Sequence, residues 1–277
     1  MANLNSSTAL ALKVALAACP ESGHVLGQSS VYFLPISTVF NAPTVTKDVG
    51  FGCGDSLLLQ LQHPLLPRPK TLTGVTNMAG QHRRALERVN QVNHGRSLPV
   101  MLYHGDAIWK PTAGTPNPHP LNPVPIDAFG QFDSILALDC AYHFSTRKLF
   151  LEQCFARLLS ETGRIALADM CFEPNSSFLG RHTALLWAIA LSVPSANLVT
   201  LSQYRSQLEC IGYDDIQIED ISAHVFPGLI AFLRSRGLLW GIFAYMLRIW
   251  WKTGGRYVLV SASKPKEGVK RSFASSN

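Results

Sequence analysis

The segment "VTKDVGFGCGDS" (residues 45–56) decides the fold of this chain. Gly50, Gly52 and Gly54 alternate directly after a short apolar stretch, and Asp48 stands two residues before the first of them. Glycine permits positive φ angles and lets a backbone approach a ligand closely. The pattern therefore indicates a strand that turns sharply into a helix, and in open α/β sheets small molecules bind at such a point.

The spacing of these glycines argues against a dinucleotide. Dinucleotide folds use Gly-x-Gly-x-x-Gly and place a pyrophosphate over the helix N-terminus. Here the next position of that pattern is Asp55, whose charge would repel a pyrophosphate. No acid follows about 20 residues later, where a ribose-binding carboxylate normally sits. Asp48 suits a cationic ligand instead, and a glycine-rich turn without a ligand is the alternative interpretation.

Strand and helix patterns alternate around this turn. Strands are predicted at 45–50, 70–76, 99–107, 132–139 and 164–172, and helices at 55–62, 79–93 and 145–163. This alternation predicts a parallel sheet with helices on both faces. After 173 the chain is mostly helical, with strands at 214–222 and 256–265 and a long apolar segment at 225–251.

Five motifs in this order resemble those of class I S-adenosylmethionine-dependent methyltransferases, in the small-molecule branch related to tocopherol and sterol methyltransferases and cyclopropane synthases. They are "DVGFGCGD", "LTGVTNMAGQHRRALERV", "YHGDA", "FDSILALDCAYHF" and "LLSETGRIALADM". The resemblance covers 45–172 well and 200–263 loosely. It implies an α/β, Rossmann-like fold with a mostly parallel seven-stranded sheet, helices on both faces and a helical substrate cap.

The resemblance also implies S-adenosyl-L-methionine as the cofactor. The residues that it places at this cofactor are Asp48, Gly50, Gly52, Gly54, Thr76, Asn77, Gln81, Asp106, Ala107 and Leu138. Asp48 is expected to act on the cationic end, directly or through the glycine turn. Thr76, Asn77 and Gln81 are expected beside the ribose and methionine part, and Asp106 at the adenine amino group. Methyl transfer mainly requires an acceptor that is held close and aligned.

The loop after the fourth strand, "DCAYHF" (139–144), is where the acceptor meets the methyl group in this fold. His143 is a candidate general base, or it only orients the loop. Tyr142 is a candidate hydrogen-bonding residue for the substrate, or it packs. In cyclopropane synthases a carboxylate occupies the position of Tyr142, so fatty-acid cyclopropanation is not expected. No His/Cys cluster has metal-ligand spacing, and no metal is predicted.

Aromatic residues are frequent in the region after 173. Trp187, Phe226, Trp240 and Phe243 either belong to the core or line an apolar pocket. The leading hypothesis is O- or C-methylation of an apolar small molecule in secondary metabolism, with N-methylation left open. One alternative is a cofactor-binding protein of this fold that catalyses a cyclisation instead. A nicotinamide-dependent oxidoreductase is disfavoured by the glycine spacing.

A membrane-peripheral methyltransferase acting on a lipid or a quinone is a further alternative. In that case the segment 225–251 contacts the bilayer, with Arg234, Arg236, Arg248 and Lys252 at the headgroups. These cations also interrupt the segment, so a transmembrane span is not expected there. The sequence leaves the oligomeric state open.

Composition places the chain in a broad class. Of 277 residues 47% are hydrophobic, and the net charge is +6. The cations form no run except at the C-terminus, in "KPKEGVKRS", so they give no strong signal for nucleic-acid binding. Six cysteines without Cys-x-x-Cys spacing indicate reduced thiols and a cytoplasmic location, with membrane association possible only through 225–251. The N-terminus lacks the basic region of a signal peptide and is expected to be a helix.

We expect one methyltransferase domain over 1–265. It divides into an N-terminal cap (1–44), a cofactor-binding core (45–172), and a helical cap with sheet-completing elements (173–252), followed by a disordered tail (266–277). Lys47 is unusual, because the first strand of this fold is normally apolar throughout. Tyr32 is the candidate to close the cofactor pocket.

Overall fold

The computed structural model describes residues 6–17, 45–94, 98–111, 119–123, 131–159, 163–173, 186–189 and 191–265. In its first half the elements are α1 (Ser6–Ala17), β1 (Val45–Val49), α2 (Asp55–Gln62), β2 (Thr71–Thr76), α3 (Ala79–Asn93), β3 (Val100–His104) and β4 (Ser134–Leu138). The second half contains η1 (Ala141–His143), α4 (Arg147–Arg157), β5 (Arg164–Phe172), η2 (Ser195–Asn197), α6 (Leu201–Ile211), β6 (Asp214–Asp220), α7 (Ser222–Arg234), α8 (Leu238–Lys252) and β7 (Gly255–Ser263).

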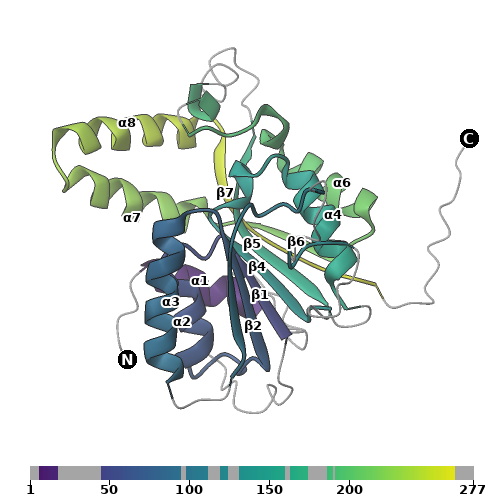
Figure 1. Cartoon of the computed structure of the whole chain (residues 1–277). Helices are drawn as coiled ribbons and strands as arrows, with labels where there is room; N and C mark the ends of the chain where they lie inside the picture. Colours follow the sequence, from purple (N-terminus) through teal and green to yellow (C-terminus); the bar gives the residue numbers. More distant parts are fainter. Residues whose placement is uncertain are drawn as a thin grey trace, which may run out of the picture.

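The seven strands form one sheet in the order β3-β2-β1-β4-β5-β7-β6 (Figure 1). Every pairing is parallel except the two made by β7, which runs antiparallel to both β5 and β6. This arrangement confirms the predicted fold. The strand order reverses at β1, which lies between β2 and β4, so the glycine turn that follows β1 stands at the switch point of the sheet.

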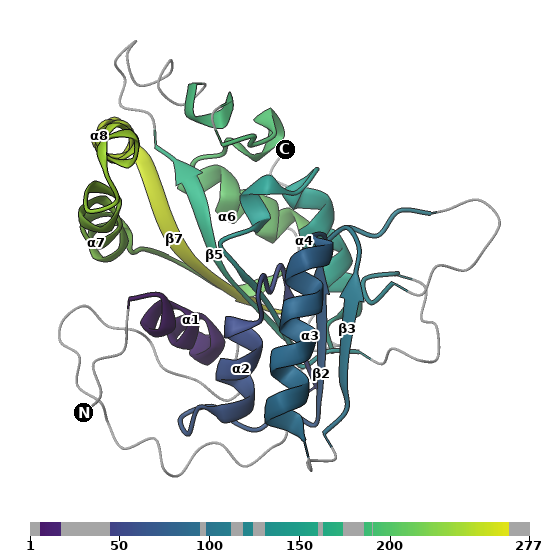
Figure 2. The same cartoon turned by 60° about the vertical axis from the view of Figure 1, so that its left-hand side comes forward.

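Helices cover both faces of the sheet. Figures 1 and 2 show α4 and α6 on one face, and α1, α2 and α3 on the other. The strand β5 serves both sides: Ile165 and Leu167 pack with the α4 and α6 core, whereas Ala166 and Ala168 join the core under α1, α7 and α8. A strand buried on both faces is apolar nearly throughout, which explains why its pattern could be predicted from sequence.

Several predicted elements differ in extent from the observed ones, and the difference is largest for two of them. The helix predicted at 145–163 ends at Arg157, because Leu158 turns to an extended conformation and pairs with Phe132 ahead of β4. The apolar segment 225–251 is two helices, α7 and α8, separated by a turn in which Gly237 has φ +110°. Helical periodicity alone did not show that interruption.

The unusual Lys47 is accommodated inside β1. Its side chain is fully buried, and its Nζ lies 5.4 Å from the centre of the Phe132 ring. Among the residues that the structure describes, this nitrogen has no hydrogen-bond partner. Burial lowers the pKa of Lys47 well below its ordinary value, which favours a neutral amine.

Some predictions fall outside the described residues, namely Tyr32, most of the N-terminal cap and the tail at 266–277. The predicted N-terminal helix is present as α1. Within the described ranges, no helix is long and apolar enough to cross a membrane. The five described cysteines are free thiols: Cys53, Cys140, Cys154, Cys171 and Cys210.

Candidate cofactor and acceptor site

All three glycines of the turn after β1 adopt left-handed φ angles, +73° at Gly50, +55° at Gly52 and +91° at Gly54. A Cβ atom added to Gly50 would lie 2.5 Å from Cys140 Sγ, and one added to Gly54 would lie 3.0 Å from Ala85 Cβ. These two glycines allow the loop after β4 and the helix α3 to pack closely. Gly52 is different, because a Cβ there would meet no atom within 4 Å.

The open side of Gly52 belongs to a large cleft of about 710 Å³. The cleft is lined by Gly50, Gly52 and Leu138 and continues along α2. Arg88 of α3 lies at its border and fixes the turn, because its guanidinium donates to Cys53 O and to Asp55 Oδ1, both at 2.7 Å. The charge of Asp55 is thus paired, and Arg88 is a residue that sequence reasoning missed.

Asp48 lies beneath the turn rather than in the cleft lining. Its side chain is buried, and Oδ2 accepts a hydrogen bond of 2.8 Å from Gln60 Nε2 of α2. Burial raises the pKa of Asp48 to about 7, and hydrogen bonds from Ser56 and Gln60 oppose part of that rise. The carboxylate therefore ties the strand to the helix on either side of the turn.

The residues predicted after β2 lie next to one another. Thr76 is buried at the end of the strand, with Oγ1 3.5 Å from Gln81 Oε1. Asn77 follows it and is exposed. The backbone N–H of Gly105 donates to Thr76 O at 2.9 Å, which joins the loops after β2 and β3.

Asp106 and Ala107 begin the loop after β3. The exposed Asp106 carboxylate accepts from Ile108 N and forms an ion pair with Lys110 Nζ, both at 3.1 Å, while Ala107 is buried. His119 Nε2 lies 2.9 Å from Asp106 O and supports this loop. Like the predicted residues after β2, these two lie at the carboxyl edge of the sheet. Neither Asp106 and Ala107 nor Thr76, Asn77 and Gln81 line the large cleft.

A carboxylate between two tyrosines marks the loop after β4. Asp139 has φ +54°, and its Oδ1 accepts a 3.1 Å hydrogen bond from the Tyr142 hydroxyl. The hydroxyl of Tyr257, in β7, also donates to it. Asp139 keeps solvent contact, yet the surrounding protein removes enough water to raise the pKa of its carboxyl.

The pKa values of Tyr142 and Tyr257 are raised as well, mainly by burial. Both hydroxyls are thus neutral hydrogen-bond donors. Sequence reasoning selected Tyr142 but missed Asp139 and Tyr257, because the contact between β4 and β7 has no local signal.

His143 is exposed, and it lines neither the large cleft nor the small apolar cavity beside Tyr142. Its ring packs against that of Tyr142, with the ring centres 4.2 Å apart. The turn η1 therefore brings the two predicted chemical residues together, but it buries only Tyr142.

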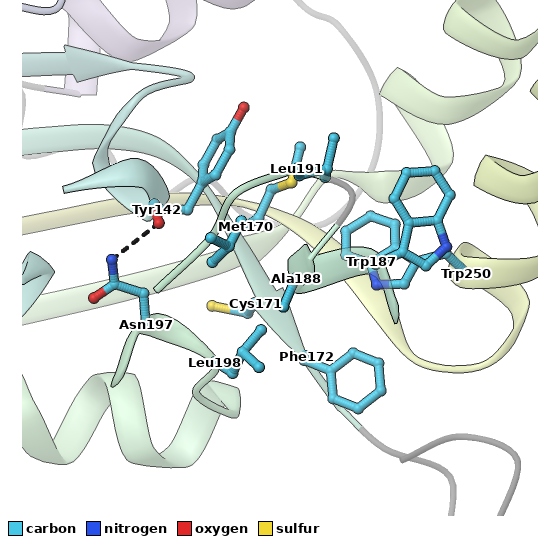
Figure 3. A pocket seen from close by; sticks show the side chains of 11 residues that line it. Tyr142, Met170, Cys171, Phe172, Trp187, Ala188, Leu191, Asn197, Leu198 and Trp250 are labelled. Carbon is cyan, nitrogen blue, oxygen red and sulfur yellow. Dashed lines mark hydrogen bonds between the residues drawn. The ribbon is translucent and has the colours of Figure 1, made fainter. Parts of the chain in front are cut away.

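A small apolar cavity lies beside Tyr142 (Figure 3). Its volume is about 20 Å³, and Met170, Trp187 and Trp250 contribute to its walls. Tyr142 and Asn197 are the polar side chains in this lining. A space of this size holds about one water molecule, so an organic acceptor requires the walls to separate.

Of the four aromatic residues predicted to be in the core or at a pocket, Trp187 alone lines this cavity. Phe226 is buried in the core, and Phe243 packs against Trp187 with ring centres 5.5 Å apart. Trp240 is exposed on α8.

A buried polar network holds the turn η1 from behind. Asn197 Nδ2 donates to Tyr142 O at 2.9 Å, a bond drawn in Figure 3, and to Phe144 O at 2.6 Å. The Arg147 backbone N–H donates to Asn197 Oδ1, and the Arg147 guanidinium is paired with Asp169 at 2.7 Å. The network fixes the Tyr142 backbone and was not predicted.

Comparisons with known proteins identify the fold. No family model matches the chain. No curated protein matches its sequence. Solved structures do match in shape. Phosphoethanolamine N-methyltransferase 2 of Haemonchus contortus, in complex with S-adenosyl-L-methionine, has 15% identity and a TM-score of 0.58, with 83% of this chain and 50% of that one covered.

Two further structures cover more of their own length. Geranyl diphosphate C-methyltransferase from Streptomyces coelicolor A3(2), in complex with Mg²⁺, geranyl diphosphate and S-adenosyl-L-homocysteine, has 15% identity and a TM-score of 0.57, covering 80% of this chain and 72% of that one. The [4+2]-cyclase SpnF has 17% identity and a TM-score of 0.60, covering 94% and 81%. The chain thus has the fold of these proteins, and it spans half the length of the Haemonchus enzyme.

Proposed function

We propose that this chain is an S-adenosylmethionine-dependent methyltransferase that acts on an apolar small molecule by O- or C-methylation. The observation that carries the proposal is the turn at the switch point of the sheet, where Gly52 has a left-handed φ and faces open space. The fold shared with structures that hold S-adenosylmethionine or its product supports it.

The residues at the carboxyl edge fit such a cofactor. The open backbone at Gly52 would receive the amino-acid portion, and Leu138 offers an apolar contact in the same cleft. Asn77 and Gln81 would hold the ribose, and the exposed carboxylate of Asp106 would accept from the adenine amino group. Asp48 would act through the turn that it braces, because its carboxylate is already bonded to Gln60. When bound, S-adenosylmethionine supplies an electrophilic methyl group.

The acceptor would lie at the small cavity beside Tyr142, whose walls are almost entirely apolar. Tyr142 would hold Asp139 in place through its hydroxyl. Asp139, with its raised pKa and its solvent contact, is our candidate to take a proton from a hydroxyl or carboxyl acceptor. His143, the last residue of η1, is retained as the second candidate base.

Calorimetric titration of the purified chain tests the cofactor proposal. We expect micromolar binding of S-adenosylmethionine and S-adenosylhomocysteine and no binding of NADPH. Incubation with S-adenosylmethionine labelled in the methyl group, together with apolar alcohols, acids and prenylated rings, then tests transfer. Failure of both sulfur ligands to bind would overturn the proposal. If S-adenosylmethionine binds but its labelled methyl group reaches no acceptor, the cofactor assignment stands and the proposed methyl transfer does not.

Cyclisation is the second candidate function, favoured by the shape shared with the [4+2]-cyclase SpnF over 94% of this chain. A neutral tyrosine donor in an apolar pocket would suit such a reaction. The two functions separate cleanly in one assay, because only methyl transfer consumes S-adenosylmethionine and releases S-adenosylhomocysteine.

A further inference from the structure

The helices α7 and α8 form a hairpin inserted between two neighbouring strands. The strands β6 and β7 pair antiparallel, so a short turn would connect them. Residues 221–254 are placed there instead, and Figure 1 shows the hairpin standing out from the sheet. Because β6 runs parallel to β5, the hairpin leaves from the same carboxyl edge that carries the glycine turn.

The helix α8 is apolar on opposite sides. Its inner side, with Ala244, Leu247 and Trp250, is buried. The outer side carries Leu238 and Ile242, which are 83% and 53% exposed. Further exposed apolar side chains are Leu239, Trp240, Tyr245 and Met246 on α8 and Phe232 on α7. A helix that is hydrophobic all round is normally covered on every side.

Positions 238, 242, 245, 246 and 249 recur at helical spacing, so they form one continuous stripe along α8. The 15 residues of this helix extend about 22 Å. An exposed apolar stripe of this length marks an interaction surface rather than scattered surface residues.

The charges around this stripe are all of one sign. Between residues 221 and 256 the sequence contains no Asp or Glu, whereas Arg234, Arg236, Arg248 and Lys252 lie at the turn or along α8. All four are exposed, and the Arg236 guanidinium covers the Phe232 ring at 4.8 Å. Long cationic side chains beside apolar surface reach the headgroups of a lipid bilayer while their stems stay apolar.

A second copy of the chain fits this surface less well. A two-fold contact through α8 would bring the same cations of both copies together without any acid from the hairpin to neutralise them. An anionic bilayer complements both the apolar stripe and the cations.

We propose that the outer side of the α7–α8 hairpin docks on the surface of a bilayer that contains anionic lipids. The helix α8 lies in the interface plane, with Leu238, Ile242 and Tyr245 inserted and Arg248 and Lys252 at the headgroups. This goes beyond methyl transfer and does not depend on it.

Co-sedimentation of the full chain with vesicles tests the proposal. The probes are phosphatidylcholine vesicles and phosphatidylcholine vesicles containing phosphatidylglycerol. We expect binding to the anionic vesicles that is at least about tenfold stronger than to the neutral ones and that weakens as salt is added. Equal binding to both vesicles, or binding to neither, would overturn the proposal.

Substitutions with matched controls locate the contact. Ile242→Glu is expected to weaken binding to the anionic vesicles at least about tenfold, and Arg248→Gln about fivefold. Leu86→Glu and Arg84→Gln make the same chemical changes on the exposed side of α3 and are expected to bind like the wild type. Circular dichroism confirms that each variant is folded. If Ile242→Glu binds as well as Leu86→Glu, the hairpin is not the docking element.

Sedimentation velocity without vesicles tests whether a second copy of the chain covers the stripe instead. A wild-type dimer that Ile242→Glu converts to a monomer would assign the stripe to a second copy and reject the bilayer. A sedimentation coefficient that is the same for both proteins, together with the loss of vesicle binding in Ile242→Glu, is the expected result.

Discussion

The two halves of the carboxyl edge differ in how ready they are for a ligand. On the β1–β4 side the glycine turn borders a cleft of about 710 Å³. The conformation of this turn is fixed by a hydrogen bond from Arg88 and by the packing of Gly50 on Cys140. On the β5–β7 side the cavity beside Tyr142 measures about 20 Å³. One half is preformed, whereas the other is closed by apolar side chains.

This difference indicates which part of the site is rigid and which part is expected to move. Backbone hydrogen bonds and ion pairs hold the glycine turn, so a ligand there needs little rearrangement. The walls of the small cavity are held largely by packing, for example between Trp187 and Trp250, whose ring centres are 5.6 Å apart. Packed aromatic rings can separate without leaving a charge unpaired, so the acceptor half is the one expected to open.

The largest effect is expected on the open half. Gly52→Arg fills the space that a Cβ finds empty and adds a cation to the cleft, so affinity for S-adenosylmethionine is expected to fall at least about a hundredfold. Calorimetric titration measures the loss. Gly228→Arg, at an exposed helical glycine with free space, is the control and is expected to bind normally. Equal affinities for both variants would mean that the cleft is not the cofactor site.

The polar support behind the closed half is tested next. Arg147→Met leaves the Asp169 carboxylate buried without its cation, and removing one partner of a buried pair costs about 3–5 kcal/mol. Urea unfolding measures the change in the free energy of unfolding. Lys148→Met, which breaks an exposed pair on the same helix, is expected to cost below about 1 kcal/mol. A small effect of Arg147→Met would show that this buried ion pair contributes little to the stability of the fold.

Asp48, beneath the glycine turn, is expected to make the stability of the fold depend on pH. Its folded-state pKa of about 7 lies above its ordinary value of 3.8. The stability it contributes is therefore fully present below about pH 4 and is lost as pH rises through about 7.

Asp48→Asn is consequently expected to gain stability relative to the wild type as the pH rises over this range, by an amount on the order of a few kcal/mol. Thermal unfolding at several pH values measures it, with the exposed Asp214→Asn as the control. A difference between Asp48→Asn and the wild type that stays constant with pH would contradict the raised pKa.

The smallest effect is expected at the border of the two halves. The Tyr142 hydroxyl donates to Asp139 and lowers its pKa, against the larger opposing effect of burial. Tyr142→Phe removes this bond, so the acid limb of the pH–rate profile is expected to move up by about 0.5–1 pH units. His143→Ala leaves the bond intact and removes only the smaller charge effect of His143 on Asp139, so it is expected to move that limb less than Tyr142→Phe does. A limb that moves only in His143→Ala would make His143 the base.

The fold was predictable because its signals are local. The patterns of α2, α3 and β5 gave the residue bounds that the structure has, since caps, glycines and apolar runs lie within each element. The glycine turn and its position in the sheet were likewise predicted from neighbouring residues.

The candidate site was predictable only in part. One cleft is lined by Gly50, Gly52 and Leu138, which belong to two of the sequence motifs. Tyr257, in contrast, donates to Asp139 from a strand far along the chain, where no motif indicated it. The hydrogen bonds that Arg88 and Asn197 donate also join segments that are distant in the sequence, so no local pattern predicts them. The role of each site residue, and the division of 1–265 into cap and core, stay predictions.

The large cleft also contains a thiol that a reagent can modify. Cys53 is a partly exposed free thiol in the cleft lining, and Cys210 is an exposed free thiol on α6 at the other face of the sheet. A maleimide reagent therefore meets one thiol that a bound ligand would shield and one that it would not. The ratio of the two alkylation rates therefore reports how much of the cleft is occupied by a ligand, and the measurement requires neither a methyl acceptor nor turnover.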